Sequence, residues 1–369
     1  MVETGGWGGI GHYAHCLNQA LVSKGASVRL VTHADHYQLD EFDKSYPVDK
    51  VFKGDGFITD WKRLYQAWKG ESIIHFQSLL STRRDWLAFV AMKFLIPQAK
   101  IIVTAHNVLP HEVAFGEKWA YKKVYALADG IVVHSDATKK KLRKMMGQGF
   151  RTPVEMIPHG HYGQITGETL PDRATSIQVL GLDENFQYMV CFGAIRPYKG
   201  IDLLMKAISE VKNWPADLKV LVIGHLLTGV TKEELITLRH QLGLEEIVSF
   251  DLRYVPEDEI PHIFSITDIS LLPYRNIDQS GILMAALAAG KPVLCTPVGA
   301  FPEIIQRDFG FLSDAVSVDA IACSLTQAIE QRSQWADMGK AAKKVAMAEY
   351  GWDSIAAKTL EFYNKVSLN

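Results

Sequence analysis

The sequence has few cysteines and almost no net charge. Its four cysteines, Cys16, Cys191, Cys295 and Cys323, lie far apart and form no C-x-x-C pair. They therefore predict neither a disulfide framework nor a zinc site, and they suit a reducing cytoplasm. The formal net charge of −2 argues against a dedicated nucleic-acid-binding protein, so we expect no nucleic acid among the partners.

Long hydrophobic runs and a leader sequence are also missing. The longest apolar stretch, Trp86–Ile96, is interrupted by Lys93 and is about half as long as a membrane span. It predicts a buried or interfacial helix. No basic–apolar–small signal peptide opens the chain. We therefore expect a cytoplasmic protein.

The composition is that of a globular protein. The 369 residues are 48% hydrophobic and 22% charged, which excludes disorder, collagen and coiled coil. The chain is too long for one typical core, so two domains are expected. Lys and Arg exceed Asp and Glu over residues 1–165, whereas the reverse holds over residues 166–369. This asymmetry predicts surfaces of opposite sign on the two halves.

Short apolar runs alternate with amphipathic helical stretches along the chain. This alternation indicates βαβ units and doubly wound parallel sheets, and hence an α/β fold of two Rossmann-like domains facing each other across a cleft. The segment 160–173 has the composition of a linker and places the domain boundary near residue 165. The expected strands are 28–32, 72–76, 101–105, 130–134, 154–157, 188–192, 219–223, 247–250, 269–272 and 292–295.

The N-terminus departs from this pattern. A doubly wound domain normally begins with a strand that leads into a glycine-rich turn. Here only about three residues precede the glycines at 5–11, so either the reading frame starts at an internal Met or the first strand is stunted. The expected helix His12–Ser23 follows. Such a cluster can bind an anion, but a tight packing turn is an equally good interpretation, and no G-x-x-x-x-G-K-[ST] motif occurs.

Two further turns have the composition of anion sites. FGAIRPYKG, residues 192–200, follows an apolar strand and opens the helix 201–211, so Arg196 and Lys199 would supply charge beside free helix N–H groups. A solvated basic turn is the alternative. PYRNIDQSG, residues 273–281, places Ser280 and Gly281 at the start of the helix 282–289.

These residues resemble the family 4 glycosyltransferases of the GT-B fold. GGWGGIGHYAHCLNQALVSKGASVRLVT, FGAIRPYKGIDLLMKAI and YRNIDQSGILMAALAAGKPVLCTPVGAFPEII carry the resemblance, and TAHNVLPHE, IPHGHY and RYVPEDEIPHIFSITDISLLPY extend it in order. It implies an acceptor domain at 1–165, a nucleotide-sugar domain at 166–350 and a helix at 351–369 that returns to the first domain. The implied activity is retaining, metal-independent hexosyl transfer from a nucleotide-diphosphate sugar, without a cofactor.

The resemblance also assigns residues. The catalytic group is His106 with Arg196 and Lys199, which would hold the diphosphate. Acceptors would be glycans, lipid-linked sugars or small molecules. The donor-binding residues implied are Gly8, Gly9, Arg196, Lys199, Arg253, Val255, Asp278, Gln279, Ser280 and Gly281. The histidines His75, His134 and His159 are interpreted as hydrogen-bonded structural residues.

Two departures from the family pattern bear on activity. The family's E-x₇-E pair falls on Ile277 and Ala285, and only Asp278 lies near either position. The arginine that usually follows the glycine directly is displaced to Arg196. Without the carboxylates a double displacement lacks a nucleophile, so a same-face route assisted by the departing phosphate is favoured. A catalytically silent sugar-nucleotide or partner-binding protein is the alternative, and a sugar-nucleotide epimerase is disfavoured.

Aromatic and basic residues gather in the first half, in 61–69, 83–89 and 139–146. Basic amphipathic stretches can lie on anionic lipid, whereas ordinary helices with solvated lysine faces are the simpler interpretation. The sequence leaves open a peripheral association of the N-terminal domain with the inner face of an anionic membrane.

Overall fold

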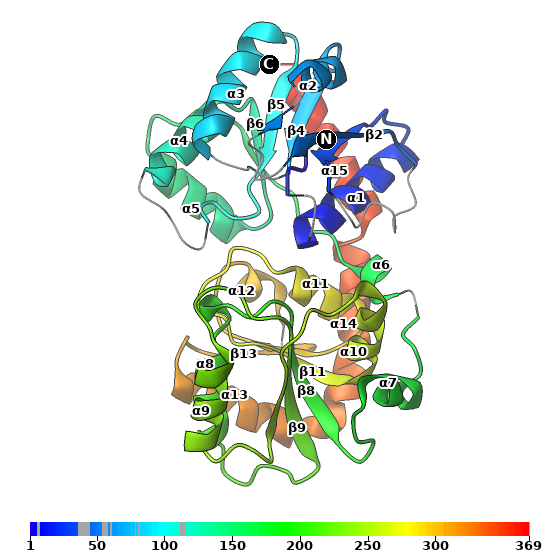
Figure 1. Ribbon diagram of the computed structural model, residues 1–369, viewed down its shortest axis with the longest axis vertical. Helices are drawn as coiled ribbons and strands as arrows, with labels where there is room; N and C mark the ends of the chain where they lie inside the picture. The colour runs from blue at the N-terminus through cyan, green and yellow to red at the C-terminus, as the bar shows by residue number, and fades with distance from the viewer. Residues whose placement is uncertain are drawn as a thin grey trace. The chain divides into compact units, whose positions relative to one another are not determined.

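The structure is a computed structural model, in which the chain folds into two units (Figure 1). Unit 1 comprises Met1–Gly160 and Tyr350–Asn369, and unit 2 comprises His161–Glu349. Each has parallel strands flanked by helices, which confirms the predicted α/β class. The described residues are 1–5, 8–35, 45–53, 58–59, 61–77, 79, 82–110, 116–167, 169–306 and 308–368.

Unit 1 holds two groups of strands. The order β1-β2-β3 forms one group, in which β1 and β2 are parallel, and β4-β5-β6-β7 forms a parallel group. The strands are β1 (Leu30–His33), β2 (Val48–Lys53), β3 (Ile58–Thr59), β4 (Ile73–Phe76), β5 (Lys100–Thr104), β6 (Gly130–Val133) and β7 (Val154–Met156).

Val2 joins these two groups. It bridges both Val31 of β1 and Phe76 of β4 in parallel pairing. The Val2 N–H donates to the His75 carbonyl at 2.8 Å, and the Gln77 N–H donates to the Val2 carbonyl at 2.8 Å. The expected first strand is therefore represented by a single bridging residue, and the strands of unit 1 run β3-β2-β1-Val2-β4-β5-β6-β7.

The helices of unit 1 include one from the end of the chain. They are α1 (Gly8–Ser23), α2 (Trp61–Trp68), α3 (Thr82–Leu95), α4 (Glu117–Leu127), α5 (Asp136–Met146) and α15 (Trp352–Ser367). Helix α15 packs against α1, with the Trp352 and Tyr13 rings 5.1 Å apart. It also covers Gly130, where an added Cβ would lie 2.8 Å from the Phe362 ring.

Unit 2 is a six-stranded parallel sheet in the order β10-β9-β8-β11-β12-β13. In chain order this is 3-2-1-4-5-6, the arrangement of dinucleotide-binding folds. Its strands are near-continuously buried, as expected where helices cover both faces. They are β8 (Gln187–Phe192), β9 (Leu218–Ile223), β10 (Val248–Asp251), β11 (Thr267–Leu272), β12 (Val293–Cys295) and β13 (Gly310–Leu312).

Helices flank this sheet on both sides in Figure 1, with α8, α9 and α13 along one side and α10 and α14 along the other. Helix α8 contacts α13 and α9, and α11 contacts α14. The helices are α6 (Gly163–Thr166), α7 (Arg173–Leu180), α8 (Ile201–Glu210), α9 (Lys232–Gln241), α10 (Ile260–Ile266), α11 (Gly281–Ala288), α12 (Phe301–Ile304), α13 (Val318–Glu330) and α14 (Trp335–Glu349), with the short 3₁₀ turns η2 (Pro197–Lys199), η3 (Glu257–Glu259) and η4 (Arg332–Gln334).

Several sequence-based expectations differ from the structure. Helix α1 begins at Gly8, not at His12, so Gly8 and Gly9 lie in its first turn. The segment interpreted as a linker contains α6. Strands β2, β3 and β13 were not expected, because charged residues interrupt the apolar pattern of β2 and the other two are very short. Among the described residues, no helix is both long and apolar enough to cross a bilayer.

Candidate functional site

The strand order of unit 2 defines where a ligand would bind. The order reverses between β8 and β11, and in open α/β sheets ligands bind beyond the carboxyl ends of the strands at that point. The loop 193–200 follows β8, and the loop 273–280 follows β11. The structure therefore brings both predicted anion turns of the second half to one edge.

Lys199 is a buried cation at this edge. Its side chain is only 6% exposed, and its Nζ donates to the Phe192 carbonyl at 3.4 Å. The same Nζ lies 5.2 Å from the centre of the Tyr274 ring. A carbonyl and a ring face compensate a buried ammonium only in part, so the group favours an anion beside it. Arg196 is partly buried in the same loop.

The loop after β11 ends in an N-cap. The Ser280 side chain accepts a hydrogen bond from the Leu283 N–H at 3.3 Å, which begins α11. Gln279 is 9% exposed, and both polar atoms of its amide lack a hydrogen-bond partner among the described residues. Leaving such a group unpaired is costly, so the amide is available to a ligand. At Gly281 an added Cβ would lie 2.5 Å from the Tyr162 ring.

Arg275 fixes the two loops against each other. Its guanidinium pairs with Asp202 of α8 through bonds of 2.7 and 2.6 Å, and it also donates to the Pro197 carbonyl. Gly200 has φ +70°, and an added Cβ there would lie 2.0 Å from the Pro273 carbonyl oxygen. The close approach requires glycine, and it places Lys199 beside the loop 273–280.

Two other predicted donor-binding residues, Val255 and Arg253, lie at the same edge of the sheet, one buried and the other held in ion pairs. Val255 is buried, as expected of a position that offers its backbone. Arg253 donates to Asp251 at 3.0 and 3.1 Å and also pairs with Glu259, so two carboxylates already balance its charge. These ion pairs raise the pKa of Arg253. Arg253 therefore adds less free positive charge to the edge than the sequence suggests.

The two positions of the missing carboxylate pair are buried and apolar. Ile277 is 6% exposed and Ala285 is 4% exposed. Asp278 is buried as well, and its backbone carbonyl accepts from the Ala300 N–H at 3.1 Å. The side chain of Asp278 is the one carboxylate that the segment 277–285 offers.

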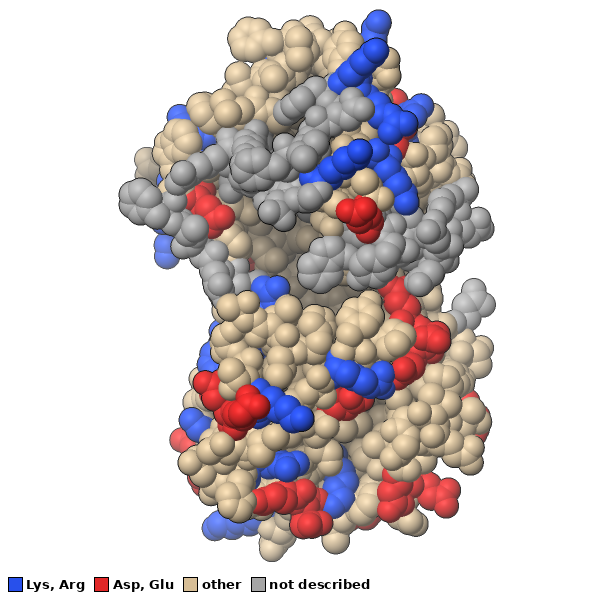
Figure 2. All heavy atoms as spheres, in the orientation of Figure 1, with Lys and Arg blue, Asp and Glu red and all other residues tan. Residues whose placement is uncertain are grey.

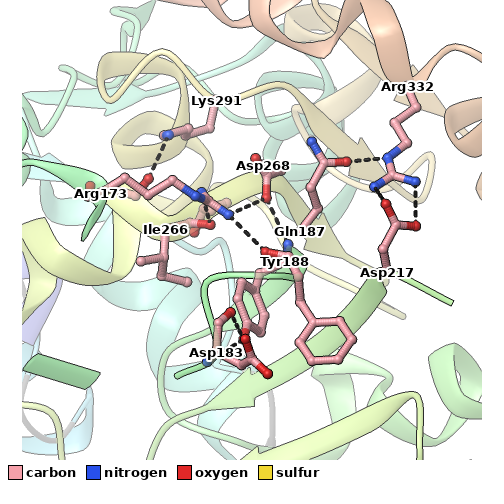
Figure 3. Close-up of polar contacts among 12 residues, drawn as sticks. Arg173, Asp183, Gln187, Tyr188, Asp217, Ile266, Asp268, Lys291 and Arg332 are labelled. Carbon is pink, nitrogen blue, oxygen red and sulfur yellow. Dashed lines mark hydrogen bonds and ion pairs between the residues drawn. The ribbon is translucent and has the colours of Figure 1, made fainter. Parts of the chain in front are cut away.

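The opposite edge of the sheet carries a different polar network (Figure 3). The Arg173 guanidinium donates to the Ile266 carbonyl at 2.8 Å and to Asp268 at 3.0 Å, and Asp268 also accepts from the Tyr188 N–H at 2.7 Å. Lys291 lies beside it, and burial lowers the pKa of Lys291 to about 8. These groups form hydrogen bonds and an ion pair with one another at the amino ends of β8 and β11. We therefore interpret the network as structural.

Unit 1 gathers histidines at the carboxyl edge of its own sheet. His75 lies in β4, His106 and His134 follow β5 and β6 closely, and His159 follows β7. The Nδ1 atom of His106 lies 3.1 Å from Nε2 of His134, and Nε2 of His106 lies 3.2 Å from the Gln77 amide.

Burial keeps these rings neutral. It lowers the pKa of His134 to about 4 and that of His159 to about 3, and it holds the pKa of His106 well below its usual value. The Tyr13 ring contacts three of the histidines, with its centre 4.7 Å from His106, 5.2 Å from His134 and 4.9 Å from His159.

Gly8 and Gly9, the two glycines that begin α1, lie near the surface of unit 1. Gly8 has φ +75° with open space where a Cβ would stand, and Gly9 is exposed. A cavity of about 410 Å³ lies elsewhere in unit 1, between α15, β1 and β4, lined among others by Met1, Arg29 and Tyr363. It meets the amino ends of those strands, away from His106. In the described part of the chain, no group of three His, Cys, Asp or Glu side chains could hold a metal ion.

Some residues of both edges were not predicted from the sequence. Gln77 is hydrogen-bonded to His106 and the Tyr274 ring faces Lys199, but neither was among the predicted site residues. Gln77 follows β4 directly and Tyr274 lies two residues beyond β11. The position of polar and aromatic residues just after parallel strands is therefore the signal that could have found them.

Two family models match consecutive parts of the chain. A model described as "Glycosyltransferase Family 4" matches residues 7–161, and one described as "Glycosyl transferases group 1" matches residues 172–345. Together they span both units.

Two characterised relatives show the range of chemistry among similar sequences. A GDP-mannose-dependent alpha-(1-6)-phosphatidylinositol monomannoside mannosyltransferase of Mycobacterium tuberculosis is 29% identical over 47% of this chain. That match spans only 46% of the mycobacterial protein, about half of its length. A lipopolysaccharide 1,2-N-acetylglucosaminetransferase of Salmonella typhimurium is 21% identical over 82% of this chain and 81% of the relative.

Solved structures share the fold. The Anabaena protein HepE, solved in complex with UDP-glucose, superposes with a TM-score of 0.79 over 99% of this chain and 98% of its own, at 18% identity. At that identity the likeness establishes the fold alone.

Proposed function

The chain belongs to the family 4 glycosyltransferases and has the GT-B fold, and on this premise we propose that it is a retaining hexosyltransferase. It would move a sugar from a nucleotide-diphosphate donor to a glycan, lipid-linked or small-molecule acceptor. The observation that carries this proposal is that the loops beyond β8 and β11, at the switch point of unit 2, each hold a buried polar side chain: the Lys199 ammonium and the unsatisfied Gln279 amide.

We place the donor on unit 2. Lys199 and Arg196 would pair with the diphosphate, whose charge would compensate the buried ammonium. The first N–H groups of α11, beyond Ser280 and Gly281, would bind the distal phosphate. Gln279 and Asp278 would contact the donor sugar, and the Val255 backbone, with Arg253 beside it, would meet the base.

We place the acceptor on unit 1. His106 would lie near the transferred sugar and the acceptor hydroxyl, and the exposed start of α1 at Gly8 and Gly9 would approach the phosphates or the sugar. The acceptor classes named for the two relatives, a phosphatidylinositol mannoside and a lipopolysaccharide, support a glycan or lipid-linked acceptor.

The reaction would proceed on one face of the donor sugar. The bond between the anomeric carbon and the phosphate oxygen breaks, the acceptor oxygen forms the new bond from the same side, and the acceptor proton passes to the departing phosphate. Lys199 and Arg196 would stabilise the negative charge on that phosphate, so the proposal requires no metal. Apolar Ile277 and Ala285 offer no carboxylate for a double displacement.

A catalytically silent sugar-nucleotide-binding protein is the alternative. Membership of a transferase family does not favour it. The buried Lys199 fits both proposals, because a bound diphosphate would compensate its charge in either. The alternative predicts donor binding without hydrolysis or transfer.

The test begins with a thermal-shift screen over nucleoside diphosphates and their sugars, because a specific ligand stabilises the fold by mass action. Donors that raise the Tm are then assayed for hydrolysis and for transfer to glycan and lipid-linked acceptors. Lys199→Met should lose both the rise in Tm with donor and the enzymatic activity. Lys206→Ala, which removes an exposed lysine of α8, should keep both. A donor that binds wild type and Lys199→Met equally would contradict the proposed site.

We further propose that unit 1 associates with anionic membrane. Figure 2 shows Lys and Arg side chains gathered over the region of α2 and β2 in this view. The exposed basic residues of these elements and the turn after α2 are Lys50, Lys53, Lys62, Arg63 and Lys69, which we term the α2–β2 basic patch. On the other side of α2, Leu64 and Trp68 are buried in the core. The basic face is therefore held toward solvent, where it would meet acidic headgroups.

Vesicle sedimentation tests this association. Binding to vesicles of anionic and neutral phospholipid should exceed binding to neutral vesicles and weaken as salt rises. Reversing three charges (Lys62→Glu, Arg63→Glu and Lys69→Glu) should abolish it. Reversing three exposed lysines of unit 2 (Lys206→Glu, Lys212→Glu and Lys232→Glu) should not. Salt-independent binding would contradict an electrostatic mode.

A further inference from the structure

A continuous hydrogen-bonded series crosses the carboxyl edge of unit 1. The Ile157 backbone carbonyl lies 2.9 Å from Nδ1 of His134, and Nε2 of His134 lies 3.1 Å from Nδ1 of His106. Nε2 of His106 then lies 3.2 Å from the Gln77 amide. All of these groups belong to unit 1.

The carbonyl sets the direction of the first two bonds. A carbonyl oxygen only accepts, so Nδ1 of His134 must carry the hydrogen and donate to Ile157. His134 is buried and neutral, so its Nε2 carries a lone pair. Nδ1 of His106 lies 3.1 Å from this lone pair, a hydrogen-bond distance. Because the lone pair can only accept, Nδ1 of His106 must carry the hydrogen and donate it.

The state of the outer nitrogen of His106 follows. His106 is buried and neutral as well, so one hydrogen on Nδ1 leaves Nε2 with a lone pair. The Gln77 amide must then present its nitrogen to His106, because an oxygen would face a second acceptor. Amide oxygen and nitrogen are assigned from the network around them, and this network assigns the nitrogen to the atom at 3.2 Å.

The other end of the series is compatible with this direction. With its nitrogen toward His106, the Gln77 amide turns its oxygen toward Nε2 of His75, 3.3 Å away. That nitrogen can donate to it and to the Thr104 hydroxyl at 2.7 Å, while Nδ1 accepts from the Tyr363 hydroxyl at 2.6 Å. The same turn of the amide places its oxygen 3.0 Å from the Met1 sulfur, so the bond that the nitrogen would donate to that sulfur is given up.

We propose that His134 is a positioning residue that holds His106 in its Nδ1–H tautomer, so that Nε2 of His106 accepts a hydrogen bond from a hydroxyl of the bound sugars. The role of His106 rests on the proposed function, whereas its tautomer does not. A bound hydroxyl would replace the Gln77 amide at Nε2. Tyr13, which is 1% exposed and lies against both rings, keeps water from Nδ1.

The tautomer is measured directly by two-bond ¹H–¹⁵N correlation spectra of the ¹⁵N-histidine-labelled protein at neutral pH. The His106 signals are identified by their loss in His106→Asn. We expect a protonated Nδ1 and an unprotonated Nε2 for both His106 and His134. An Nε2–H tautomer of His106, or a doubly protonated ring, would overturn the proposal.

Variants separate positioning from packing. His134→Phe removes the acceptor for Nδ1 of His106 and should give a mixture of His106 tautomers, whereas His134→Gln, whose amide oxygen can accept, should restore the Nδ1–H form. His159→Phe is the matched control: it removes a neighbouring buried ring whose Nδ1 donates to the Gly160 carbonyl at 2.7 Å, and it should leave the His106 tautomer unchanged.

Kinetics complete the test. The kcat of sugar transfer should fall at least about tenfold in His134→Phe, with the donor KM unchanged, and should recover in His134→Gln. An unchanged tautomer in His134→Phe would refute the positioning role. If the tautomers behave as expected but no variant, nor wild type, transfers sugar, then the proposed function fails while the assignment of His134 stands.

Discussion

The ammonium group of Lys199 lies 5.2 Å from the centre of the Tyr274 ring, although the two residues follow different strands. One belongs to the turn after β8 and the other to the loop after β11, the two strands between which the sheet order reverses. The lysine is thereby held at the edge of the sheet instead of extending into solvent. In this position its charge can pair with a bound diphosphate, and substitutions in either loop should alter that pairing.

Removing either cation of the turn should abolish transfer. Lys199→Ala and Arg196→Ala should each lower kcat/KM about 100-fold or more, the usual effect of losing one group that stabilises developing charge. Circular dichroism should show intact folding in both variants. Sugar transfer at the normal rate by either of them would contradict the assignment, and Lys206→Ala is the control for loss of a nearby exposed lysine.

Gly200→Ala should disturb the same turn through the backbone. The new Cβ would lie 2.0 Å from the Pro273 carbonyl oxygen, so the loops 193–200 and 273–280 must separate. Gly181→Ala is the matched control, because Gly181 has φ +63° but nothing within 4 Å of an added Cβ. The control should cost about 1 kcal/mol of unfolding free energy from strain alone, and Gly200→Ala about 2 kcal/mol more from the clash. Equal losses in urea denaturation would show that the loops are not in close contact.

Acid should destabilise the histidine edge. The pKa of His75 is lowered to about 3, that of His134 to about 4 and that of His159 to about 3, mainly by burial. In the unfolded chain these rings titrate near 6.5, so below that pH the unfolded state binds more protons. Each ring then costs the folded state about 1.4 kcal/mol per pH unit.

The measurement compares unfolding free energies at pH 7.5, 6.0 and 5.0. Wild type should lose stability steadily as pH falls below 6.5, and His159→Phe should lose it less steeply. Identical pH slopes in the two proteins would mean that His159 ionises in the folded state as it does in the unfolded chain.

The network in Figure 3 should contribute to stability and not to donor binding. Arg173→Ala removes donors to Asp268 and to the Ile266 carbonyl, at a cost of about 2 kcal/mol. Lys340→Ala breaks only an exposed pair with Asp337 and should cost almost nothing. The donor KM should be unchanged in both variants, and a raised KM in Arg173→Ala would place this network at the functional edge instead.

Much of the fold followed from sequence pattern because parallel strands covered on both sides are continuously apolar. Runs such as 188–192 and 219–223 fall inside β8 and β9. Strand β2 was missed because its charged residues interrupt the apolar pattern, and the start of α1 was placed too late because glycines weaken any helix signal.

The candidate site was foreseeable in its residues but not in its contacts. Lys199 could be selected from its position after a strand, but its burial depends on Tyr274, which lies 75 positions later in the chain. The same holds for His134: a histidine at the end of a strand indicates a place at the sheet edge, whereas its bond to His106 requires the register of β5 against β6. The ion pairs of Arg253 likewise arise only in three dimensions.

The return of α15 to unit 1 bears on how the chain is made. Trp352 covers Gly160 and Phe362 covers Gly130, so the core of unit 1 needs the last helix to be complete. During synthesis unit 2 is finished first, because all of its residues, 161–349, precede α15. Residues 1–160 are therefore made before the helix that covers part of their core, and the nascent chain would most need protection from aggregation during that interval.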